Sequence, residues 1–195
     1  MEQTNLTPEQ SLLLISKTIE ETKDRFKEYG SVFVFWGALT IFVFGSQLAL
    51  SLLELYRFTM LPVYLFPAGG IFTGIWAWRD HQKQNKPKTF IAGVLQNIGW
   101  IIGINLMIMG FLFSNQLGQA LGPVFIILFA LMILVSGLAI KFKPLIIGGA
   151  ITNVIGLTSF MMDADYHGFS LMFGALVGMI IPGLLLNRAR RKEHV

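Results

Sequence analysis

Six long stretches without a single charged side chain constrain what this chain can fold into more than any other feature. Each stretch is 18 to 25 residues long, which is enough for an α-helix to cross a hydrocarbon core of about 30 Å. We therefore predict an all-α, polytopic membrane protein with six transmembrane helices. The predicted spans are Val32–Leu53, Phe58–Trp78, Thr89–Phe113, Pro123–Ile140, Leu145–Met162 and Phe169–Leu186.

Basic residues are distributed unevenly over the connections between these stretches. Arg57 stands alone after the first span, whereas the other 14 of the 15 Lys and Arg residues fall on the opposite side of the predicted membrane. Because positive residues near spans stay in the cytoplasm, we expect both termini to be cytoplasmic and the number of spans to be even. The 14 residues are Lys17, Lys23, Arg25, Lys27, Arg79, Lys83, Lys86, Lys88, Lys141, Lys143, Arg188, Arg190, Arg191 and Lys192.

The composition excludes a water-soluble globule. Apolar residues make up 54% of the chain, and the uncharged run Thr89–Ile140 alone would need a larger polar shell than this chain can supply. The run divides at the polar segment Ser114–Gly122, which we predict to join two spans. The net charge of +4 lies in short loops beside the spans, so we expect it to meet membrane lipid and not nucleic acid. Without cysteine there is no disulfide or thiol nucleophile.

The first 30 residues predict a cytoplasmic amphipathic helix. Thr7 and Gln10 have the spacing of a capping box, and Pro8 suits a first helical turn. An isolated helix cannot hold an apolar stripe in water, so lipid, the bundle, a second copy or another protein must cover it. Residues 1–30 carry four basic and six acidic side chains, which favours a protein cover, from this chain or a second subunit, over anionic lipid. The stripe consists of Leu12, Ile15, Ile19 and Phe26.

We predict a transmembrane domain over residues 31–187 and a basic cytoplasmic tail over residues 188–195. Glycines mark a faint repeat in the transmembrane domain. Gly37, Gly93 and Gly149 open similar four-residue patterns and lie 56 residues apart. Three repeated helical hairpins would explain this spacing, with chance as the alternative. Three GxxxG pairs predict close helix packing, within the chain or in a dimer. These pairs are Gly70/Gly74, Gly99/Gly103 and Gly174/Gly178.

Polar side chains in the predicted spans are the candidate binding residues. Glu54 ends the first span three residues before Arg57, where an interfacial ion pair is one interpretation and a proton- or cation-handling role the other. The third and fifth spans carry polar side chains at matching depth, which predicts either interhelical hydrogen bonds or a small-solute site. Pro67 and Gly69–Gly70 would kink the second span and open a cavity beside the polar side chains of the third and fifth spans. The polar set is Gln96, Asn97, Asn105, Thr152 and Asn153.

No constellation of catalytic or metal-ligating residues stands out. Asp163, Asp165 and His167 offer ligand atoms, but so short a loop between spans is better explained as a solvated turn. The sequence has no nucleotide-binding glycine loop and no HExxH motif. We therefore expect no enzyme, no cofactor and no metal. The tryptophans near the cytoplasmic span ends predict an interfacial aromatic belt, formed by Trp36, Trp76 and Trp78.

Four segments carry a resemblance to a known family. They are Phe33-Val34-Phe35-Trp36-Gly37, Pro67-Ala68-Gly69-Gly70-Ile71, Lys141-Phe142-Lys143-Pro144 and Ile181-Pro182-Gly183-Leu184-Leu185-Leu186. With them, nearly the whole chain resembles a family of small, uncharacterised six-span proteins of the bacterial inner membrane, found mainly in the Bacteroidetes group. The resemblance implies a multi-pass protein of that membrane. Members are often encoded beside a winged-helix regulator, which implies a signalling or stress context.

These observations favour a non-enzymatic membrane protein that binds a partner or assists a regulatory complex. The alternative is a small transporter or channel with a polar site between the third and fifth helices. A polar cavity at mid-membrane depth would favour transport, whereas an uncovered apolar stripe on the N-terminal helix would favour a partner.

Overall fold

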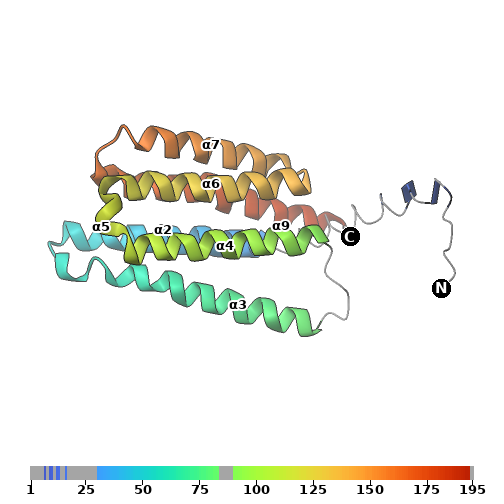
Figure 1. The fold of residues 1–195 in the computed structure, drawn as a ribbon, viewed down its shortest axis with the longest axis horizontal. Helices are drawn as coiled ribbons and strands as arrows, with labels where there is room; N and C mark the ends of the chain where they lie inside the picture. The colour runs from blue at the N-terminus through green and yellow to red at the C-terminus, as the bar shows by residue number, and fades with distance from the viewer. Residues whose placement is uncertain are drawn as a thin grey trace.

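The chain forms a bundle of helices that run side by side (Figure 1). The computed structural model describes residues 7, 9–10, 12–13, 16, 30–83 and 90–193, and this part of the chain contains no strand. The longer helices are α2 (Gly30–Leu52), α3 (Leu65–Lys83), α4 (Phe90–Leu112), α6 (Leu121–Ile140), α7 (Lys143–Ser159), α8 (His167–Ala175) and α9 (Ile181–Glu193). The short elements are η1 (Tyr56–Phe58), η2 (Leu61–Tyr64), α5 (Ser114–Leu117), η3 (Gly118–Ala120), η4 (Ala164–Tyr166) and the π-helix η5 (Leu176–Ile180).

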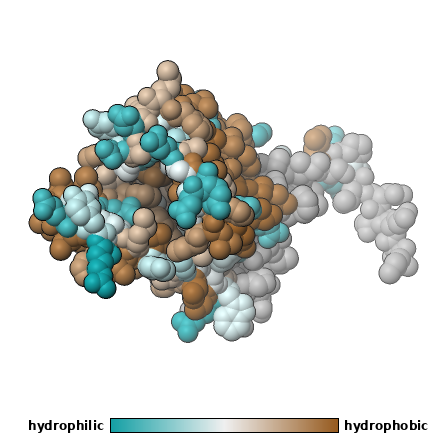
Figure 2. Space-filling view, turned by 60° about the vertical axis from the view of Figure 1, so that its left-hand side comes forward, coloured by the Kyte–Doolittle hydropathy of each residue, from teal (hydrophilic) through white to brown (hydrophobic). Residues whose placement is uncertain are grey.

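Five helical segments in the described residues are long and apolar enough to cross a membrane. The predicted all-helical membrane fold is confirmed to that extent. The fifth predicted span is not among these five segments. It corresponds to α7, which has 17 residues and a length of about 26 Å. Figure 2 shows hydrophobic residues over much of the flank of the bundle and hydrophilic residues gathered toward the end that comes forward. The five segments are Gly30–Leu52, Tyr56–Arg79, Gly93–Leu112, Ser114–Ile140 and Ala164–Ala189.

The connections between α4, α6 and α7 are where the sequence placed them. The polar segment after α4 forms the short helices α5 and η3 and then leads into α6. After α6, Lys141 takes the left-handed conformation with φ 54°, and its N–H donates to the Leu138 carbonyl while Phe142 N–H donates to the Gly137 carbonyl. This Schellman arrangement satisfies carbonyls at the end of α6. Pro144 then lies in the first turn of α7, as predicted.

Glycines set the closest helix contacts, which join α6 to α7 and α2 to the successive helices α8, η5 and α9. A Cβ built on Gly149 would lie 2.9 Å from the Leu134 backbone nitrogen, and one on Gly156 would lie 2.7 Å from Ile127. On α2, a Cβ at Gly37 would lie 2.7 Å from Ile180. Backbones approach this closely only where side chains are missing, so these glycines fix the crossings.

Pro182 reshapes the last helix. Because proline has no N–H, it cannot donate to the carbonyl of Gly178 four residues earlier. The preceding turn is the π-helix η5, after which the Ile181 N–H donates to the Leu176 carbonyl. The sequence predicted one helix over Phe169–Leu186, and the structure instead has α8, η5 and α9 in succession over residues 167–193.

The three GxxxG pairs have different outcomes. On the last helix a Cβ at Gly174 would lie 3.1 Å, and one at Gly178 2.6 Å, from Thr152 of α7, so this pair packs within the chain. Gly74 contacts the ring of Trp100, with 3.1 Å from its built Cβ to Trp100 Cη2. The other three positions meet no atom within 4 Å, so they do not pack against the described part of the chain. They are Gly70, Gly99 and Gly103.

The three glycines of the proposed repeat are not in equivalent places. Gly37 is buried against the last helix and Gly149 against α6, whereas a Cβ on Gly93 would meet nothing within 4 Å. The closest helix contacts also join different proposed hairpins: α6 of the second meets α7 of the third, and α2 of the first meets α8, η5 and α9 of the third. The structure therefore gives the three-hairpin repeat no support.

The capping box near the N-terminus is present. The Thr7 N–H donates to the Gln10 side-chain oxygen at 3.1 Å, and the Gln10 N–H donates to the Thr7 hydroxyl at 3.3 Å. Leu12 is 65% exposed. Of the predicted stripe, Ile15, Ile19 and Phe26 lie outside the described residues, so the amphipathic helix remains a prediction.

Candidate ligand cavity

An elongated cavity of about 330 Å³ lies among α2, α3, α4 and α6. Leu171 of α8 and Met179 of η5 contribute to its wall from the last helix. The lining residues on α4 run from Leu95 to Phe111, which covers most of that helix. The cavity therefore extends along the bundle and not across it.

The wall of the cavity is mainly aromatic and aliphatic. Three of the four tryptophans of the chain line it, one from each of α2, α3 and α4. Such a lining suits an apolar ligand, because the transfer of apolar surface out of contact with water or polar groups is favourable and non-directional. The aromatic lining residues are Phe33, Trp36, Phe44, Phe66, Trp76, Trp100, Phe111, Phe125 and Phe129.

The hydroxyl groups at the cavity wall are bonded to their own helices. Thr40 donates to the Trp36 carbonyl at 2.9 Å, and Ser136 donates to the Met132 carbonyl at 2.8 Å. The Thr73 hydroxyl lies 2.9 Å from the Gly69 carbonyl oxygen. These donors are satisfied locally, so they add little polarity to the lining.

Aromatic pairs and glycines together account for the space. The rings of Phe35 and Phe72 join α2 to α3 with centroids 5.5 Å apart, and those of Tyr64 and Phe111 join η2 to α4 at 5.8 Å. Side chains of this size keep the helix backbones apart. The facing glycines have no side chain to fill the gap that results, and they are Gly70, Gly99, Gly103 and Gly110.

The structure does not bring the predicted polar set together. Gln96 lines the cavity, whereas Asn97 is exposed and Asn105 donates to the Ile101 carbonyl of its own helix at 2.8 Å. These residues lie on α4, and α6 lies between α4 and α7 (Figure 1). The polar residues of the third and fifth predicted spans therefore form no common site.

The predicted polar residues on α7, Thr152 and Asn153, do not line the cavity. Thr152 is buried, and its hydroxyl lies 2.8 Å from the Gly148 carbonyl oxygen and 3.2 Å from the Gly174 carbonyl oxygen. It thereby joins α7 to the last helix just before the π-helix. Asn153, the next residue, is half-buried.

Glu54 is exposed and closes α2. It has φ 60°, its N–H donates to the Ser51 carbonyl, and the Leu55 N–H donates to the Leu50 carbonyl. No ion pair joins it to Arg57, although both residues are described. The predicted pair is therefore absent, and Glu54 does not point to the interior of the bundle.

The second span has no kink at its middle. Pro67 lies in the first turn of α3, where its missing N–H leaves no bond unmade. The helix then continues through Gly69 and Gly70 to Lys83. The cavity that Gly70 lines is therefore not the predicted one, which a kink would have opened beside the polar residues of the third and fifth spans.

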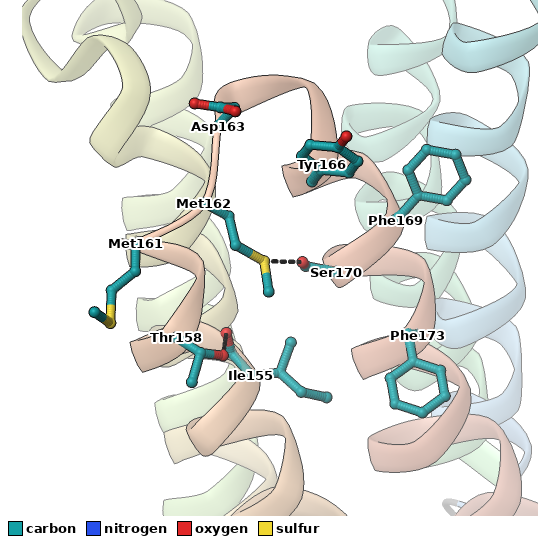
Figure 3. Close-up of a pocket in the computed structure, with 9 residues that line it drawn as sticks. All are labelled: Ile155, Thr158, Met161, Met162, Asp163, Tyr166, Phe169, Ser170 and Phe173. Atoms are coloured by element: carbon teal, nitrogen blue, oxygen red, sulfur yellow. Dashed lines mark hydrogen bonds between the residues drawn. The ribbon is translucent and has the colours of Figure 1, made fainter.

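A second, open hollow of about 570 Å³ lies between the end of α7 and the start of α8 (Figure 3). Met162 and Phe169 are among its lining residues, and the Ser170 hydroxyl lies 3.8 Å from the Met162 sulfur. Asp163 lies at its rim (Figure 3). The hollow is more open to the outside than the cavity among α2, α3, α4 and α6, so it would enclose a ligand less completely.

His167 is the one residue of the predicted solvated turn that the prediction placed wrongly. It is buried, with Nε2 3.0 Å from the Ser159 carbonyl oxygen, and a Cβ built on Gly122 would lie 2.8 Å from its ring. Asp163 and Asp165 are exposed. Within the part of the chain that the structure describes, no group of three His, Cys, Asp or Glu residues could hold a metal ion.

Gln96 is the one predicted binding residue that lines the cavity, and the aromatic lining residues were not predicted as a site. Trp36 and Trp76 were assigned to an interfacial belt, and the glycines at 70, 99 and 103 to packing. The available signal was the combination of an unpaired GxxxG face and a central Trp100 on one helix, α4. Alone, each of these features is ordinary in a membrane helix.

Comparison of the chain with protein-family models, with curated proteins and with solved structures finds no match.

Proposed function

We propose that this chain is a non-enzymatic, multi-pass membrane protein that binds a hydrophobic, membrane-dissolved molecule among α2, α3, α4 and α6. The observation that carries the proposal is the aromatic cavity, whose hydroxyl donors are bonded to their own helices. A polar solute would lose its hydrogen bonds to water on entering and would find few in return. An apolar molecule has no hydrogen bonds to water to lose. The proposal therefore replaces transport of a polar solute through a site between the third and fifth helices.

The proposal includes the membrane and topology predicted from the sequence. Six crossings, with α7 as the fifth, would place both termini in the cytoplasm of a bacterium whose inner membrane holds the protein. The resemblance to small six-span inner-membrane proteins supports this location. The uneven distribution of basic residues supports the orientation.

A partner-binding or regulatory role of the N-terminal helix is the second candidate. Leu12 and Leu13 are 65% and 70% exposed, which is unfavourable for leucines in water. A second subunit or another protein that covers Leu12, Ile15, Ile19 and Phe26 would remove this cost. Binding of a hydrophobic molecule in the bundle could then be reported to that partner.

The test of the proposed function uses bromohexadecane, a neutral chain whose bromine quenches tryptophan fluorescence. The protein is reconstituted in lipid nanodiscs and titrated. Gly99→Leu places a side chain in the cavity, and Gly93→Leu is the matched control, because a Cβ meets nothing within 4 Å at either glycine and only Gly99 lines the cavity. We expect saturable quenching in the parent chain and in Gly93→Leu, and loss of the saturable component in Gly99→Leu. Equal quenching in all three proteins would contradict the proposal.

A further inference from the structure

The lining of the cavity extends along the helices, which favours an elongated ligand. Its lining on α4 runs from Leu95 to Phe111, about 24 Å at 1.5 Å per residue. On α2 the lining runs from Val32 to Phe44, about 18 Å. A cavity of about 330 Å³ whose lining extends over this length suits an extended chain.

The two ends of the cavity differ in polarity. Gln96 lines the end where α4 begins and α6 finishes, and the Ser136 hydroxyl at that end is bonded to its own helix. At the opposite end the lining includes Val63, Phe66 and Phe111 and no polar side chain. An amphiphile would therefore place its headgroup toward Gln96 and the end of its chain toward Phe111.

The charge of the bundle ends differs in the same direction. Arg79 lies three residues beyond the cavity-lining Trp76, on the same face of α3. Lys141 and Lys143 lie at the same end, in the connection from α6 to α7 (Figure 1). At the other end of the bundle, three carboxylates accompany a single basic residue, and these are Glu54, Asp163, Asp165 and Arg57. The end with the polar lining is thus the one that attracts an anion.

We infer that the ligand is an amphiphile with a single long chain and an anionic headgroup, such as a fatty acid or a single-chain phospholipid, with its headgroup at the Arg79 end of the cavity. This inference rests on the proposed function and adds the class of ligand and its direction. The chain lies along α4 against Gly99 and Gly103. The headgroup lies beside Arg79, where a carboxylate or a phosphate finds the same cation.

The first experiment measures the charge preference. Binding of nitroxide-labelled stearate and of its neutral methyl ester is followed by tryptophan quenching in zwitterionic nanodiscs. We expect Arg79→Gln to weaken stearate binding about fivefold and to leave the ester unchanged. Arg57→Gln, an exposed cation at the opposite end, is the control and should change neither. Equal effects of the two substitutions on stearate would overturn the inference.

The second experiment measures the direction of the chain. One variant keeps Trp76 and carries Phe at the other three tryptophans, and a second has no native tryptophan but carries Phe111→Trp. We expect a nitroxide on carbon five of stearate to quench Trp76 more strongly, and one on carbon sixteen to quench the second variant more strongly. The reverse order would overturn the assigned direction. Loss of these preferences with saturable bromohexadecane binding intact would refute only this inference, whereas loss of bromohexadecane binding would refute the proposed function.

Discussion

Single glycines decide where the helices of this bundle meet and where they stand apart. Gly178 and Gly99 both belong to GxxxG pairs, yet one contacts a buried threonine and the other an open cavity. The motif itself cannot distinguish these cases, since it reports only that close approach is sterically allowed. The partner helix decides, through the size of the side chains opposite.

We predict that Gly178→Ala destabilises the bundle by about 1–3 kcal/mol. The added Cβ would lie 2.6 Å from the Thr152 hydroxyl oxygen and 3.0 Å from Ile133 Cδ1. Unfolding in mixed micelles measures the change. Gly168→Ala is the control, because a Cβ there meets nothing within 4 Å. In a Thr152→Ala background the cost of Gly178→Ala should fall, as expected for residues in contact; an unchanged cost in that background would refute this crossing.

The two residues other than glycine that have positive φ in the described part of the chain, Glu54 and Lys141, give a second prediction at this scale. A side chain in the left-handed region costs about 1–2 kcal/mol, part of which glycine's greater backbone freedom offsets. We expect Glu54→Gly to stabilise the protein by about 0.5–1 kcal/mol. Lys141→Gly should gain less, because a cation at a helix C-terminus is favourable and a carboxylate is not. A larger gain at Lys141 than at Glu54 in micelle unfolding would contradict this explanation.

At the scale of helices, α3 is less firmly held than α6. Gly69 is its only buried residue among those whose side chains are described, whereas α6 buries seven residues. Regions with few buried contacts open at lower free energy than the core. The cavity on one side of α3 adds to this difference, since it leaves the helix without partner atoms there.

We therefore predict that α3 exchanges its amide hydrogens faster than α6 and α7. Hydrogen exchange of the protein in nanodiscs, read by mass spectrometry, gives the rates by segment. The three helices are in the same nanodisc, so the comparison isolates their packing within the protein. Bromohexadecane should slow exchange in α3 and leave α7 unchanged. Exchange in α6 that is as fast as in α3 would show that the burial pattern does not set the local stability.

The sequence was sufficient to predict the all-helical fold, because helix formation depends on local properties. Apolar length, the polar segment after Phe113 and the position of Pro144 each act within a few residues. The pairing of helices could not be predicted in the same way. Whether Gly149 meets Leu134 or Thr152 meets Gly178 depends on contacts between distant segments, and an apolar surface in lipid has no hydrophobic pattern to reveal its neighbour. The π-helix before Pro182 was likewise missed, although the absent N–H of that proline was its available signal.

At the scale of the whole molecule, the predicted topology rests on the uneven distribution of basic residues. Asn115 and Tyr166 are exposed and lie at the end of the bundle where α5 and the connection from α7 to α8 meet (Figure 1). The chain has no cysteine, so single cysteines can be introduced without background. Arg57 is the only basic residue predicted for that side.

We predict that cysteines at Asn115 and Tyr166 react with an impermeant thiol reagent in intact cells. A cysteine at Asn85, which lies outside the described residues, should react only after the cells are lysed. The reagent reaches the outer face alone, so the pattern reports the side of each connection. Labelling of Asn85→Cys in intact cells without labelling of the other two would contradict the six-span topology.

The cavity is the central claim, and the position of a bromine atom tests it most directly. Crystals of the protein grown in lipid with bromohexadecane would be measured at the bromine absorption edge. We predict an anomalous peak inside the bundle, within the cavity that Gly99, Gly103 and Phe129 line, that Gly99→Leu removes and Gly93→Leu retains. Bromine found only on the outer, lipid-facing surface of the helices would contradict the account.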